Sequence, residues 1–189
     1  LPDGRGGDAT ELPPATTVAG IERFADKARG VRGAADVKRA LRYACDNSLS
    51  PMETDIAETM VFDPRMGGFG LEKPQLNPRF EVTRKNRRAL PQSAYLPDLF
   101  WPRANISVEY DSDKHHRGDR KASEDAIRRN GIEHLGTRIV TLTWGQARNY
   151  YEFERVALLV ASALGKKFGP GWDAWANRRI ELHRLLVQR

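Results

Sequence analysis

The chain of 189 residues has few features of secreted or membrane proteins. Cys45 is its only cysteine, which excludes an intramolecular disulfide and indicates a reducing compartment. The longest apolar run, from Val156 to Leu164, is much shorter than the ~20 residues that a membrane-spanning helix needs. No secretion signal is visible either. We therefore expect a cytoplasmic protein with no membrane partner.

Charge is abundant in this sequence. Charged residues make up 30 % of the chain, and lysine and arginine exceed the acids by 31 to 25, which gives a net charge of +6. The isoelectric point is about 9.7. A basic balance of this kind favours an acidic partner, and nucleic acid is the first candidate. Apolar residues still make up 40 % of the chain, which is enough for one folded core.

Composition divides the chain into segments. We expect a flexible leader or linker, a helical N-terminal segment, an α/β core and a C-terminal helix, at residues 1–16, 17–49, 50–168 and 169–189 respectively. The chain begins at Leu1 rather than Met, so we expect a trimmed protein or the C-terminal part of a longer one. An upstream domain or a protein partner is then an open alternative.

Local patterns predict the elements of that core. Ser50, Pro51 and Glu53 form a strong helix start, and the helix is expected to run to about Phe62. Further along we expect a strand at 79–83, two hairpin strands within 97–111, a helix at 119–135, a strand at 138–144 and helices at 150–164 and 172–186. This order of elements predicts an α/β sandwich around a central mixed sheet.

The hairpin within residues 97–111 carries the most informative side chains. Pro102 to Asn105 supply turn residues, and a loop there pairs residues whose numbers add to 207. Asp98 is then opposite Glu109, and Asp111 follows on the same face. Directly opposed side chains have Cβ atoms roughly 4.5–5.5 Å apart, so two carboxylates there repel each other. A hard divalent cation, which prefers carboxylate oxygens, would relieve that repulsion.

The order αβββαβ, with Asp98 at one strand and Glu109 in the next, resembles the PD-(D/E)XK restriction-endonuclease-like superfamily. More narrowly, the chain is similar to small bacterial proteins related to the very-short-patch-repair endonuclease, with a looser likeness to abortive-infection proteins. The similar segments are Ser50–Thr54, Gly67–Gly70, Asp98–Pro102, Val108–Asp113 with His116, Asp119–Arg120, Arg128–Asn130 and Val140–Thr143. The pattern Gln146-x-x-x-Tyr150 also occurs in other nucleases of the superfamily.

The resemblance implies a DNA endonuclease that depends on Mg²⁺ or Mn²⁺. Asp98, Glu109 and the Tyr110 carbonyl would bind the metal, and Glu53 would take the place of an accessory acid. Asp111 stands where the superfamily has a lysine, so Asp111 is either a further metal ligand or a turn residue. Lys114 or His116 would then supply the missing cation or act as general acid or base.

Two of these assignments have simpler alternatives. Glu53 completes a capping box by itself, without any role in a site. Basic side chains on both sides of the hairpin would bind phosphates or would lie in solvated loops; they are Arg84, Lys85, Arg87, Arg88, Arg117, Arg120 and Lys121.

Two functions other than a DNA nuclease stay open. A nucleic-acid-binding or antitoxin-like regulator could keep the fold without catalysis, and the missing motif lysine favours that alternative. A ribonuclease, or a hydrolase of another phosphodiester, is the third alternative.

Overall fold

The computed structural model describes residues 14–82, 84, 94–112, 129–133 and 136–188. The helices are α1 (Val18–Lys27), α2 (Ala34–Ala40), α3 (Pro51–Val61), α5 (Trp144–Arg148), α6 (Tyr150–Ala163) and α7 (Ala176–Leu186). Residues 129–133 are also helical. The 3-10 turns are η1 (Pro64–Met66), η3 (Pro102–Ala104) and η4 (Asp173–Trp175). The strands are β1 (Gln75–Leu76), β2 (Phe80–Glu81), β3 (Ala94–Tyr95), β4 (Leu99–Trp101), β5 (Ile106–Asp111) and β6 (Arg138–Thr143).

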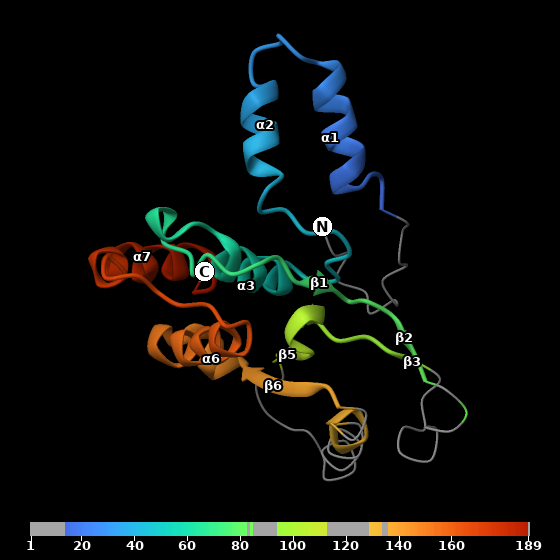
Figure 1. Ribbon diagram of the computed structural model, residues 1–189, viewed down its shortest axis with the longest axis vertical. Helices are drawn as coiled ribbons and strands as arrows, with labels where there is room; N and C mark the ends of the chain where they lie inside the picture. The colour runs from blue at the N-terminus through green and yellow to red at the C-terminus, as the bar shows by residue number, and fades with distance from the viewer. Residues whose placement is uncertain (1–13, 83, 85–93, 113–128, 134–135, 189) are drawn as a thin grey trace, which may run out of the picture.

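The main sheet has four strands in the order β1-β4-β5-β6. β4 runs antiparallel to both of its neighbours, and β5 and β6 run parallel. The fold is therefore mixed α/β with a central mixed sheet, as the order of patterns predicts. In Figure 1 the helices α3, α6 and α7 gather on one side of β5 and β6.

One face of this sheet forms the large core. Leu99, Val108 and Leu142 point to this face and are fully buried. They pack with apolar side chains of α3 and α6, among them Ile56 and Phe153. Alternation along the strands explains this face, because successive side chains point to opposite sides of a sheet.

The opposite face has a much smaller apolar cluster. It consists of Val82, Tyr95 and Ile132, with Ile139 of β6 packed against them. β2 and β3 form a separate two-stranded sheet beside it. Ser107, Glu109 and Asp111 of β5 belong to this less thickly covered face.

The N-terminal helices form a hairpin. α1 and α2 lie side by side, and Figure 1 shows them standing away from the sheet at the top of the molecule. Lys73 ties the base of the hairpin to the rest: its Nζ donates to the carbonyls of Leu41 and Ala44 at 3.4 and 3.1 Å. The Val18 amide also donates to Asp46 Oδ1 at 2.8 Å, which joins the two ends of the hairpin.

The C-terminal helix α7 packs against α3 and α6 and is part of the same body. Gly67 permits a close approach to α7, and Gly68 permits one to the end of α3. A Cβ at Gly67, which has φ +96°, would lie 2.3 Å from the Arg178 carbonyl oxygen. A Cβ at Gly68 would lie 2.0 Å from the Phe62 carbonyl oxygen. The Gly67-Gly68 pair in the sequence therefore marks a close approach of backbones.

Two sequence predictions need correction. The strand expected at 79–83 is the short β2, and β2 belongs to the small sheet rather than the main one. The first strand of the main sheet is β1, whose two residues directly follow Pro74 and are too few to establish a periodic pattern. Helices at 50–62 and 150–164 and the strand at 138–144 are confirmed within one or two residues. The predicted helix at 119–135 lies mostly outside the described residues, which include helical residues 129–133. No helix in the described ranges is long and apolar enough to cross a bilayer.

Candidate metal and phosphodiester site

The hairpin register agrees with the sequence prediction. Leu99 pairs with Val108, Phe100 with Ser107 and Trp101 with Ile106, so paired residue numbers add to 207. Asp98 directly precedes β4, and the same register places Glu109 opposite it. The predicted turn is also present, because η3 is followed by Asn105 in the left-handed conformation.

The Asp98 carboxylate binds the backbone of β5. Asp98 Oδ2 accepts a hydrogen bond from the Tyr110 amide at 2.7 Å. β5 extends beyond Val108, the residue that pairs with Leu99 at the start of β4. The Tyr110 amide therefore donates to the Asp98 side chain instead of to a backbone carbonyl of β4. The amide and carbonyl of one residue in a strand point to the same edge, so the Tyr110 carbonyl also faces the Asp98 side. Asp98 and this carbonyl are two of the three ligands that the sequence predicts.

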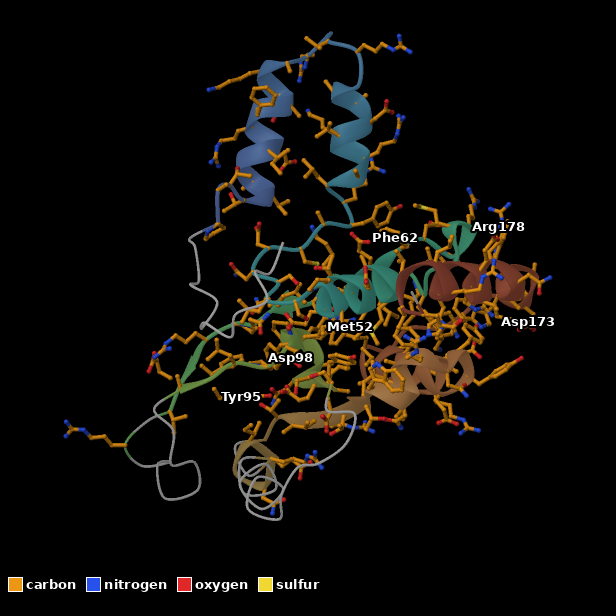
Figure 2. All side chains as sticks on the ribbon, turned by 180° about the vertical axis from the view of Figure 1, so that it is seen from behind. Met52, Phe62, Tyr95, Asp98, Asp173 and Arg178 are labelled. Carbon is orange, nitrogen blue, oxygen red and sulfur yellow. The ribbon has the colours of Figure 1, made fainter. Side chains whose placement is uncertain are left out.

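Tyr95 restrains Glu109, the third predicted ligand. The Tyr95 hydroxyl donates to Glu109 Oε1 at 2.5 Å and lies 3.4 Å from Ser107 Oγ. Tyr95 is buried in the small apolar cluster, whereas Glu109 is half-buried. The hydrogen bond therefore restrains the carboxylate without removing it from solvent. Sequence patterns do not identify Tyr95, because the contact depends on how β3 lies against β5. Figure 2 shows Tyr95 and Asp98 in one region, away from Arg178 and Asp173 of the C-terminal segment.

Asp111 is the last residue of β5 and not a turn residue. It pairs with Thr143 of β6, is half-buried, and shares the face of Glu109. Next to it, the Tyr110 hydroxyl has a raised pKa, chiefly because the ring is partly buried. The carboxyl end of β5 thus presents the carboxylates of Glu109 and Asp111 on one face, whereas the Tyr110 side chain packs against the large core on the other.

Glu53 has a structural role that its capping box predicts. It is buried, and Leu49 N and Ser50 Oγ each donate to its carboxylate at 2.9 Å. Asn77 Nδ2 donates to Glu53 Oε2 at 2.7 Å, and Asn77 N donates to the Asp98 carbonyl at 3.1 Å. Glu53 therefore connects the start of α3 to the backbone of Asp98 through Asn77.

Gln146 and Tyr150 are also explained by local structure. Gln146 Oε1 accepts from the Thr143 amide at 3.0 Å and closes the capping box of α5. Tyr150 is buried beneath α7 and donates to Glu154 Oε1 at 2.6 Å. Neither contact involves the acids of β5.

Several predicted residues lie outside the described part of the chain. These are Lys114 and His116, and the basic residues Lys85, Arg87, Arg88, Arg117, Arg120 and Lys121. Arg84 is described and exposed. The identity of the cation or general acid beside Asp98 therefore stays a prediction.

The donor set suits Mg²⁺ better than Zn²⁺. Asp98, Glu109 and the Tyr110 carbonyl offer oxygen only, and Mg²⁺ is usually held by one or two carboxylates with several waters. Within the described ranges, no group of three or more His, Cys, Asp and Glu side chains is arranged to hold a metal ion. Asp98, Glu109 and Asp111 thus do not form such a group in the described ranges, and the predicted Mg²⁺ site depends on two carboxylates and one backbone carbonyl.

No protein-family model, curated protein or solved structure gave a significant match to this chain.

Proposed function

We propose that this chain is a DNA endonuclease domain that depends on Mg²⁺ or Mn²⁺ and acts in the bacterial cytoplasm, in defence against foreign DNA or in repair. The observation that carries the proposal is the pair of restrained acids at the ends of β4 and β5. Asp98 is oriented by the Tyr110 amide and Glu109 by the Tyr95 hydroxyl. Around the main sheet, the order of α3, the antiparallel strands β1, β4 and β5, the helical residues 129–133 and the parallel strand β6 supports a restriction-endonuclease-like core.

The side chains have distinct parts in this proposal. Asp98, Glu109 and the Tyr110 carbonyl bind the cation, and Asp111 extends the acidic edge. When bound, the ion neutralises charge on the phosphate and acidifies a coordinated water. Tyr95 keeps Glu109 in place, while Asn77 and Glu53 hold the backbone of Asp98. Arg84, and the basic residues outside the described ranges, are proposed to bind DNA phosphates.

Asparagine at position 98 and glutamine at position 109 test this proposal. Asp98→Asn keeps an oxygen that can accept from the Tyr110 amide, and Glu109→Gln keeps one for the Tyr95 hydroxyl. Each substitution removes only the negative charge, so the fold should persist while plasmid cleavage falls by at least about 100-fold. Cleavage is measured with Mg²⁺, with Mn²⁺ and with EDTA, on supercoiled plasmid.

Glu181→Gln is the matched control, because Glu181 is an exposed acid on α7. It should cleave like the unmodified protein. Unchanged cleavage in Asp98→Asn would rule out Asp98 as a metal ligand and with it the proposed mechanism. Parallel assays with RNA and with single-stranded DNA separate a DNA endonuclease from a ribonuclease.

The substitution of aspartate for the superfamily lysine at position 111 favours a second function, a regulator that binds nucleic acid without cutting it. This alternative predicts salt-sensitive DNA binding in EDTA and no cleavage with any divalent cation. Asp98→Asn would then leave binding unchanged.

A further inference from the structure

The α1–α2 hairpin, residues 17–45, carries most of the excess positive charge of the chain. It contains seven lysines and arginines and three acids, a net +4 of the chain's +6. The basic residues are Arg23, Lys27, Arg29, Arg32, Lys38, Arg39 and Arg42. None of the proposed site residues belongs to this hairpin.

Two of these cations form salt bridges with acids of the hairpin, and Arg29 has a weaker electrostatic interaction with Asp26. Lys38 pairs with Asp26 and Arg39 pairs with Asp36. In the described part of the chain, no salt bridge is made by the other five, which are Arg23, Lys27, Arg29, Arg32 and Arg42. All five are exposed.

The spacing of the cations is unfavourable for the hairpin alone. Arg23 and Lys27 are four residues apart on α1, so they are neighbours on one helix face and repel each other. Arg29 and Arg32 follow in the tip loop, on either side of Val31, which is 64 % exposed. A surface that gathers like charges in this way suits a polyanion.

The hairpin is also fixed relative to the proposed site. Asn77 Nδ2 donates both to the Asn47 carbonyl, just after the hairpin, and to Glu53. The amide of the same Asn77 donates to the Asp98 carbonyl at 3.1 Å. Asn77 therefore connects the base of the hairpin to Asp98, a proposed metal ligand, through its hydrogen bonds.

The length of α1 sets how far the tip of the α1–α2 hairpin projects from its base. α1 has ten residues, and a helix rises ~1.5 Å per residue, so the tip stands about 15 Å from the base. Both views show the hairpin projecting from the body (Figures 1 and 2). On DNA with a rise of ~3.4 Å per base pair, such an arm reaches phosphates several base pairs from the one at the site.

We propose that the tip of the α1–α2 hairpin, formed by Lys27, Arg29 and Arg32, is a second phosphate-binding surface that grips nucleic acid beside the acidic site. The identity of its ligand as DNA rests on the proposed function. The surface binds backbone without reading sequence, since phosphate contacts carry no base information.

The test compares two variants that lose the same charge. Lys27→Gln/Arg29→Gln/Arg32→Gln neutralises the tip. Arg138→Gln/Lys167→Gln/Arg184→Gln neutralises three exposed cations elsewhere. Binding to a 30-base-pair fluorescent duplex is measured by anisotropy in EDTA over a range of salt concentrations, so that no cleavage interferes.

We expect the tip variant to bind at least about tenfold more weakly than the control variant. Its slope of log K against log salt should be smaller by about two to three, because each lost phosphate contact removes ~0.9. Arg29→Gln/Arg32→Gln, confined to the loop, should give the same trend without altering a helix. Equal affinity and slope in the tip and control variants would overturn the proposal.

Two further arms separate this inference from neighbouring ideas. If the tip variant loses binding to phosphatidylserine vesicles but not to DNA, the hairpin is a membrane-binding surface and the proposal fails. Plasmid cleavage is the second arm, and the Arg138→Gln/Lys167→Gln/Arg184→Gln control should keep both its DNA binding and its cleavage. If no protein cleaves DNA and only the tip variant loses binding, the hairpin proposal stands and the endonuclease proposal fails.

Discussion

Polar side chains occupy two very different settings in this molecule. Between α6 and α7, Arg179 is 3 % exposed, donates to Tyr150 and Trp172, and lies 3.5 Å from Glu154. At the ends of β4 and β5, Asp98 and Glu109 are half-buried, and each accepts one of the hydrogen bonds described above. The buried charge of Arg179 connects two helices. Asp98 and Glu109 are restrained but still exposed to solvent, so they can also contact a ligand.

One substitution tests the buried contacts of Arg179 between α6 and α7. Arg179→Ala removes a guanidinium whose carbon lies 3.7 Å from the centre of the Trp172 ring, and it leaves Tyr150 and Glu154 without that partner. We expect a loss of about 3 kcal/mol in the free energy of unfolding, since breaking a buried charge pair leaves an uncompensated group. Denaturant titration measures the loss.

Its neighbour provides the control. Arg178 is exposed, stacks on Trp175 and donates to the Arg65 carbonyl, so Arg178→Ala should cost no more than about 1 kcal/mol. The folded fraction of Arg179→Ala should retain DNA cleavage. Equal losses of stability in the two variants would contradict the structural role of Arg179.

The second region is tested through Tyr95. Tyr95→Phe removes the hydroxyl that restrains Glu109 but keeps the ring, which stacks on Phe80. Stability should change by no more than about 1 kcal/mol, whereas metal affinity or cleavage should fall by about 10- to 100-fold, as for other residues that orient metal ligands. Cleavage rates measured over a range of Mg²⁺ concentrations give both the metal affinity and the cleavage rate.

Tyr151→Phe is the matched control, because Tyr151 is 66 % exposed on α6. It should leave stability and cleavage unchanged. Partial recovery of Tyr95→Phe at high Mg²⁺ is expected if the hydroxyl only positions the ligand. A large loss of stability without loss of metal response would instead make Tyr95 a core residue.

Local rules predict the parts of the fold whose causes are local. The helix start at Ser50 depends on residues within one turn, and the Ser50 hydroxyl indeed accepts from the Glu53 amide at 3.2 Å. The hairpin register follows from the turn at 102–105 and from alternation along β5, so the amino-acid sequence alone predicts the relation of Asp98 to Glu109.

What the sequence does not reveal depends on distant contacts. β1 has two residues, too few to establish a periodic pattern, so only pairing with β4 defines it. Tyr95 meets Glu109 across fourteen residues of separation, and Asn77 meets Glu53 across twenty-four. Patterns thus predict the acids but not the groups that hold them, because tertiary packing brings those groups together.

A smaller effect concerns His183, a buried titratable group one turn after Arg179 on α7. Its ring is 1 % exposed and lies 5.0 Å, centre to centre, from that of Phe153. Nε2 is 2.7 Å from the Ala147 carbonyl oxygen, which can only accept, so Nε2 carries the proton of a neutral ring. Nδ1 is buried without a hydrogen-bond partner in the described part of the chain.

The environment of His183 predicts acid sensitivity in the α6–α7 region. Burial lowers the pKa of His183 below its ordinary value of 6.5, so the unfolded chain binds this proton more readily than the folded one. Stability from this group is therefore complete above pH 6.5 and decreases as pH falls below it, by at most about 1.4 kcal/mol per pH unit. Unfolding midpoints between about pH 8 and pH 5 measure the slope. His183→Gln, whose amide can still donate to Ala147, should flatten that slope, and an unchanged slope would assign the acid sensitivity to other groups.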